Sequence, residues 1–149
     1  MGLMDDVGRG PVGIDSAIFI YFIEAHPSYF ALARTLFSAL DEDRCQGVTS
    51  ALTLLETLVV PYRVGNPALA ERYELLLSHS RGLKLVELDH ALLRAAARLR
   101  ADYAVKTPDS IQLAAALSKG CTTFFTHDRP LSKVQGLRVL QIGQYLPAQ

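Results

Sequence analysis

The clearest helix start in the 149-residue chain is Thr107-Pro108-Asp109-Ser110, and the stretch continues as Ile111-Gln112-Leu113-Ala114-Ala115-Ala116-Leu117. Thr107 is a residue type that caps helices, and Pro108 suits the first helical position, where a missing N–H costs nothing. Asp109 then places a carboxylate in the first turn, where unpaired N–H groups and the helix dipole favour negative charge. The stretch therefore predicts a helix that begins with an acidic side chain.

Short apolar segments alternate with helical patterns along the rest of the chain. We expect five strands, at residues 12–14, 47–50, 83–88, 122–126 and 138–142. Helical spacing of apolar residues predicts further helices at residues 17–23, 29–40, 51–64, 66–77 and 90–103. Strands that alternate with helices predict an α/β fold of three layers, in which helices cover both faces of a central parallel sheet of about five strands.

Length and composition limit the classes of protein to consider. We expect one domain at residues 12–149, preceded by a flexible tail at residues 1–11, which lack any periodicity. The net charge is zero, so nucleic-acid binding would need a local basic patch. Cys45 and Cys121 lack metal-ligand spacing, and with no secretory signal they predict reduced thiols in a cytoplasm. No apolar run is long enough to span a membrane.

Four acidic residues are expected at one edge of this sheet. In a parallel α/β sheet the carboxyl ends of the strands and the amino ends of the helices share an edge, the usual place for a ligand. Asp15 ends the first strand, and Asp128 follows the fourth. Asp109 opens the helix before the fourth strand, and Glu56 lies in the early turns of the helix after the second.

Each acid also has a purely structural explanation. Asp15 could cap the next helix, and Asp128 could belong to a turn. Glu56 is the only charge at residues 51–60, a helix that we expect to be buried nearly all round, and a buried unpaired carboxylate is costly. Converging carboxylates need a compensating positive charge. Mg²⁺ or Mn²⁺ would provide it and could hold a phosphodiester for in-line attack, whereas zinc would want histidine or cysteine ligands.

The ordered set of motifs resembles the PIN domain and, more narrowly, the VapC-type toxins of bacterial and archaeal toxin–antitoxin pairs. The resemblance rests on Ile14-Asp15-Ser16, Ser50 with Glu56, Pro108-Asp109-Ser110-Ile111 with Leu113-Ala114-Ala115-Ala116-Leu117, and Thr126-His127-Asp128-Arg129. It covers residues 12 to about 142. A tail before Val12 that is longer than in many relatives, and a region from Tyr62 to Arg81 without a matching motif, depart from the family pattern.

The resemblance implies a Mg²⁺- or Mn²⁺-dependent ribonuclease that cuts single-stranded or loop RNA and is inhibited by a co-encoded antitoxin. Members of the family are commonly homodimers. Carried over by position, the catalytic and metal-binding acids would be Asp15, Glu56, Asp109 and Asp128. Ser16 and Thr126 would hydrogen-bond these carboxylates or the substrate.

Two basic residues are candidates for RNA contacts, and two other functions are possible for this fold. Arg129 and Lys106 could contact an RNA phosphate, although a solvated surface charge explains each more simply. Strand alternation is expected to turn His127 away from the site. A catalytically silent RNA- or partner-binding module on the same fold is an alternative to the enzyme. A phosphoacceptor signalling domain would need adjacent acids after the first strand, where Ile14-Asp15-Ser16 offers only one.

Overall fold

The computed structural model of the protein describes residues 2–127, 131 and 133–147. Helices and strands alternate along this chain as predicted. The elements are α1 (Leu3–Val7), β1 (Val12–Ile14), α2 (Ser16–Ile23), α3 (Phe30–Asp41), β2 (Gly47–Ser50), α4 (Leu52–Arg63), α5 (Pro67–His79), β3 (Leu83–Val86), α6 (His90–Asp102), α7 (Thr107–Ser118), β4 (Thr123–Thr126), β5 (Arg138–Gln141) and the 3-10 helix η1 (Ile142–Tyr145).

The five strands form one sheet in the order β3-β2-β1-β4-β5, and every neighbouring pair is parallel. β1 is central, and Val12 is aligned with Gly47 of β2 on one side and with Thr123 of β4 on the other. The predicted parallel α/β sheet is therefore confirmed. Because β1 and β4 are neighbours, the segments that follow Ile14 and Thr126 leave the sheet side by side.

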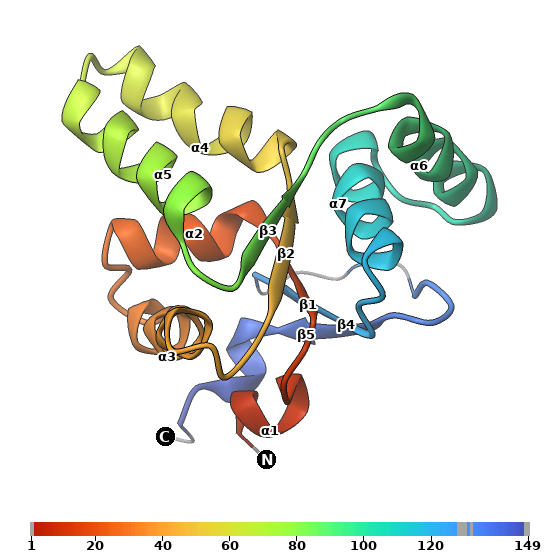
Figure 1. The fold of residues 1–149 in the computed structure, drawn as a ribbon, viewed down its shortest axis with the longest axis horizontal. Helices are drawn as coiled ribbons and strands as arrows, with labels where there is room; N and C mark the ends of the chain where they lie inside the picture. The colour runs from red at the N-terminus through yellow and green to blue at the C-terminus, as the bar shows by residue number, and fades with distance from the viewer. Residues whose placement is uncertain (1, 128–130, 132, 148–149) are drawn as a thin grey trace.

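Helices cover both faces of the sheet (Figure 1), with α2, α3, α4 and α5 on one side and α6 and α7 on the other. Successive strand residues point to opposite faces, so Phe125 packs with α2 and α3, whereas Phe124 packs with α6 and α7. Gly13 allows α7 to approach β1 closely, since a Cβ there would lie 2.7 Å from the Cβ of Ala116. The carboxyl-terminal part of α7 is thereby held against the central strand of the sheet.

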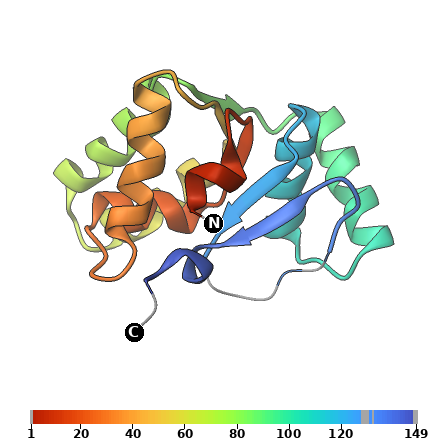
Figure 2. The same ribbon diagram turned by 90° about the horizontal axis from the view of Figure 1, so that it is seen from below.

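The amino-terminal segment is not the tail without regular structure that the sequence favoured. Residues 3–7 form α1, and Leu3 and Val7 are buried in the same core as β1 and α3. The Tyr145 hydroxyl donates a hydrogen bond of 2.6 Å to Asp6, which ties α1 to the carboxyl-terminal end of the chain, as Figure 2 also indicates from below. A single helical turn is too short to show apolar periodicity, so the sequence pattern could not predict it.

The region from Tyr62 to Arg81, which matched no motif, is mainly helix α5. It packs against α4 and α2 around Tyr73, whose side chain is fully buried and whose hydroxyl donates a hydrogen bond to Glu24. Arg72 donates a hydrogen bond of 3.0 Å to the Ile23 carbonyl. This region therefore supports the α2 and α4 side of the molecule. No helix in the described part of the chain combines the length and apolar character needed to cross a bilayer.

Helix α4 differs from its prediction. The sequence favoured a helix buried nearly all round, but α4 lies at the margin of its layer and exposes several large apolar side chains. The exposed residues on α4 and just beyond it are Leu55, Val59, Val60, Tyr62 and Val64. Only one stripe of the helix faces α2, α5 and α7.

Candidate active site

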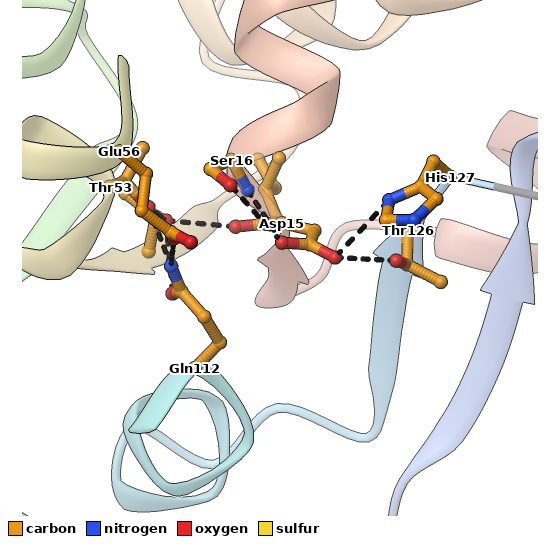
Figure 3. A network of polar contacts seen from close by, with 9 residues as sticks. Asp15, Ser16, Thr53, Glu56, Gln112, Thr126 and His127 are labelled. Atoms are coloured by element: carbon orange, nitrogen blue, oxygen red, sulfur yellow. Dashed lines mark hydrogen bonds and ion pairs between the residues drawn. The ribbon is translucent and has the colours of Figure 1, made fainter. Parts of the chain in front are cut away.

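Asp15 lies where β1 ends and α2 begins, as predicted. It is the N-cap of α2, and its Oδ1 accepts a hydrogen bond of 2.8 Å from the Ser16 N–H. The other oxygen, Oδ2, accepts a hydrogen bond of 2.6 Å from the Thr126 hydroxyl at the end of β4. Asp15 is 5% exposed, and these contacts fix its carboxylate at the carboxyl end of the sheet (Figure 3). Its capping role is real, and it holds Asp15 at the predicted place.

Glu56 projects from the second turn of α4 towards the same edge. Burial raises the pKa of its carboxyl, and the nearby charges of Asp15 and Asp109 raise it further. Hydrogen bonds from Gln112 and Ser16 act in the opposite direction. Both aspartates thus lie close enough to Glu56 for their charges to act on it, and a joint metal site of the three acids stays a prediction.

Asp109 lies in the first turn of α7, where it was expected. The helix starts one residue earlier than predicted, however, because Lys106 is its N-cap and Thr107 its first residue. The Thr107 side chain does not cap the helix but accepts a hydrogen bond of 2.8 Å from Arg100. Arg100 also donates to the Val105 carbonyl at 3.1 Å, so α6 braces the segment that carries Asp109.

Gln112 is a site residue that the sequence reasoning missed. It is 3% exposed, and it contacts both β2 and α4 from one turn beyond Asp109. Its Nε2 donates to Thr53 Oγ1 at 2.8 Å and to Glu56 Oε1 at 3.3 Å. A buried glutamine within an alanine-rich helix is the signal that could have identified it, since a buried amide needs partners.

His127 lies nearer to the site than strand alternation predicted. Its Nδ1 is 3.8 Å from Oδ2 of Asp15, and its side chain is about one-third exposed. Figure 3 shows the imidazole beside Thr126, on the side of Asp15 away from Glu56. The expectation that it points away is wrong, because β4 ends at Thr126 and the strand alternation does not extend to residue 127.

The remaining predicted residues are Asp128, Arg129, Lys106 and Ser16. Asp128 and Arg129 lie outside the described residues, so the fourth acid and one candidate RNA contact stay predictions. Lys106 is exposed at the amino end of α7, three residues before Asp109. Ser16 hydrogen-bonds Asp15 through its backbone N–H, and its hydroxyl lies 3.5 Å from the same oxygen.

The donors that converge are hard oxygen atoms. Among residues 2–127, 131 and 133–147, no three acidic, histidine or cysteine side chains come close enough together to form a complete metal-ligand cluster. Mg²⁺ nevertheless requires only one or two carboxylates, because it keeps several of its waters. Burial and, to a smaller extent, the charges of Asp15 and Asp109 raise the pKa of Glu56, and a cation between these groups would offset both effects. The residues therefore fit a small divalent cation.

Comparison with solved structures places the fold. The chain resembles VapBC2 from Rickettsia felis bound to a promoter DNA fragment, with a TM-score of 0.64 and 14% identity over 87% of this chain and 97% of that one. A toxin–antitoxin complex from Klebsiella pneumoniae gives a TM-score of 0.63 and 20% identity over 85% and 93% of the two chains. VapC20 from Mycobacterium tuberculosis, a toxin that cleaves the sarcin–ricin loop, gives a TM-score of 0.61 and 16% identity over 76% of this chain and 86% of that one.

Comparison by sequence gives the family. No curated protein matches the chain at a significant level. The family model described as the PIN domain, in contrast, matches residues 12–137, which include the three described acids of the candidate site and the position of Asp128. These residues span most of the chain and the strands β1 to β4, and the match ends one residue before β5. The protein therefore belongs to the PIN domain family.

Proposed function

We propose that the protein is a Mg²⁺- or Mn²⁺-dependent endoribonuclease and the toxin of a toxin–antitoxin pair. The proposal is carried by the positions of Asp15 where β1 ends, Asp109 in the first turn of α7 and Glu56 in the second turn of α4, and it is supported by the pKa of Glu56, which burial and the charges of both aspartates raise. A binding module without a metal would gain nothing from such repulsion. Asp128 is proposed as the fourth acid of this set, by its position after β4.

The residues of the chain have separable roles in this proposal. Asp15 is held with both oxygens engaged by Ser16 and Thr126, so it would keep its position as substrate binds. Asp15, Asp109 and Glu56 would hold the cation, with Asp128 completing the set. When bound, the cation would supply a positive charge that polarises the scissile phosphate and lowers the pKa of an attacking water.

The centre of the proposed site is acidic, so contacts with RNA phosphates would come from basic residues at its edge. Lys106, exposed at the amino end of α7, and Arg129 are both proposed to contact phosphates of the RNA. The likeness to a toxin that cleaves the sarcin–ricin loop supports structured or loop RNA as the substrate class. The zero net charge is consistent with a local contact rather than a general affinity for nucleic acid.

A cognate antitoxin is the proposed protein partner. Similar structures include toxins in complex with their antitoxins, which supports this assignment. We further propose that the protein is a homodimer that acts in the cytoplasm. The second point agrees with Cys45 and Cys121, which are both buried free thiols, and burial raises the pKa of Cys121 to about 12.

The test is cleavage of structured RNA by the purified protein with Mg²⁺ or Mn²⁺. Asp15→Asn and Asp109→Asn should each lower the cleavage rate by more than about 100-fold, because even outer-shell groups of metal sites are worth about 10- to 100-fold. Asparagine is as good an N-cap as aspartate, so Asp15→Asn should fold.

Asp89→Asn is the matched control for Asp15→Asn. Asp89 also caps a helix, through a hydrogen bond of 2.8 Å to the Leu92 N–H, but it is not among the charges that act on Glu56. This variant should cleave at the wild-type rate. If the wild type does not cleave, or if the three variants cleave like the wild type with either metal, the protein is not this enzyme and the silent binding module is the better description.

A further inference from the structure

Gln112 joins three elements that meet beside the proposed site. It extends from α7 between β2 and α4, and its amide contacts Ser50 of β2 on one side. On the other side it contacts Thr53 and Glu56 of α4 (Figure 3). Its Oε1 accepts hydrogen bonds from the Ser50 backbone N–H at 3.2 Å and from the Ser50 hydroxyl at 2.9 Å. The Thr49 hydroxyl lies 3.5 Å from the same oxygen.

These contacts determine which way the amide points. Oxygen and nitrogen of a glutamine amide are distinguished by their partners, and a backbone N–H can only donate. The atom that faces the Ser50 N–H must therefore be the oxygen, so the NH₂ group must face α4. β2, an interior strand between β3 and β1, thus fixes a hydrogen-bond donor in the direction of Glu56.

Glu56 needs such a donor more than the other acids do. Asp15 is fixed by Thr126 and by the backbone of α2, and Asp109 lies at a braced helix start. Glu56 instead lies on the half-exposed helix α4, and its flexible side chain must approach two other carboxylates. The Gln112 amide donates to its Oε1 at 3.3 Å, and this hydrogen bond favours the charged form of Glu56.

We propose that Gln112 is a positioning residue, whose amide holds the Glu56 carboxylate in front of Asp15 and Asp109 and so sets the affinity of the site for its divalent cation. This role rests on the proposed function. Gln112 does not touch the cation in this scheme. It acts by orienting a carboxylate, and outer-shell groups of this kind typically contribute about 10- to 100-fold to metal affinity.

The test measures Mn²⁺ affinity of the purified protein by calorimetry, without RNA. Gln112→Met keeps the length and volume of the side chain and removes its donor. It should weaken Mn²⁺ binding by about 10-fold or more. In cleavage assays, the Mg²⁺ concentration for half-maximal rate should rise, while the rate at saturating Mg²⁺ changes less than threefold.

A double-mutant cycle separates positioning from general support of the fold. If Gln112 acts through Glu56, Gln112→Met should change Mn²⁺ affinity less than twofold in a Glu56→Gln background. A merely structural role would weaken binding equally in both backgrounds. Thr53→Val is the matched control, since it removes the other partner of the same Nε2 but leaves the donor to Glu56, and it should bind Mn²⁺ like the wild type.

The outcomes of the experiment are distinct. A wild type that binds no Mn²⁺ overturns the proposed function and the role of Gln112 with it. A wild type that binds Mn²⁺ and a folded Gln112→Met protein with the same affinity, or with equal losses in both backgrounds, overturn only the positioning role. If Gln112→Met does not fold, Gln112→Asn replaces it in the same cycle, since it keeps a buried amide but is too short to reach both Ser50 and Glu56.

Discussion

Helices α7 and α4 each carry one acid of the proposed site, but their surroundings differ. Helix α7 is buried over residues 110–116 between the sheet and α6, whereas α4 buries a single stripe and exposes Leu55 and Val59. Both helices are rich in apolar residues. Apolar composition therefore predicts that at least one face of a helix is buried. How many faces are buried depends on the elements that pack beside the helix.

A leucine-to-alanine substitution should give the largest difference between the two helices, measured as the change in the free energy of unfolding. Leu113 of α7 is completely buried, and Leu113→Ala should lower the free energy of unfolding by about 2–5 kcal/mol because it leaves a cavity. Leu55 of α4 is 61% exposed, and Leu55→Ala should change it by less than about 0.5 kcal/mol. Urea unfolding, at protein concentrations where the chain is monomeric, measures both unfolding free energies. Equal losses would mean that the exposed face of α4 is covered in solution.

The brace on α7 should contribute a smaller amount. Arg100→Met removes the hydrogen bonds to the Val105 carbonyl and the Thr107 hydroxyl, and we expect a loss of about 1 kcal/mol in unfolding free energy. It should also reduce RNA cleavage, because Asp109 follows two residues after Thr107. Arg98→Met, at another exposed arginine of α6, is the control and should be neutral. Indistinguishable behaviour of the two variants would show that α7 needs no brace.

Much of the sheet and part of the site could be predicted from the sequence. The strands were predictable because each is a short apolar segment bounded by a helix signal, and the parallel order then placed Asp15, Glu56 and Asp109 at one edge. Thr126 was expected beside a carboxylate, and the structure places its hydroxyl on Asp15. These predictions depend only on residue periodicity and on the geometry of parallel sheets.

What could not be predicted depends on contacts between distant segments. Gln112 was visible in the sequence, but its partners Ser50 and Glu56 are 62 and 56 residues away along the chain. The place of His127 depends on where β4 stops, and the burial of Leu3 depends on a core assembled from several elements. Periodicity reports which face of an element is apolar, but it does not report which element lies opposite.

The smallest effects are expected from Glu56 and Asp109 in the absence of metal. Because the pKa of Glu56 is raised in the folded protein, the folded state binds more protons than the unfolded state between the ordinary pKa and the raised one. Stability contributed by this group is thus present at low pH and is lost as the pH rises through that interval. Glu56→Gln removes this loss, so it should stabilise the metal-free protein at pH 7, by less than about 1 kcal/mol for a half-exposed group.

Asp109→Asn should have the opposite sign at the same pH. Asp109 lies in the first turn of α7, where its charge interacts favourably with the helix dipole, so its removal should cost about 0.3–1 kcal/mol. Unfolding in EDTA from pH 4 to pH 8 tests both variants, and the gain from Glu56→Gln should shrink towards pH 4, where most of the glutamate is protonated in either state. Saturating Mn²⁺ should reverse the order of Glu56→Gln and wild type, because the cation stabilises only a folded state that binds it. A gain that persists at pH 4 would mean that Glu56 is strained by packing rather than by charge.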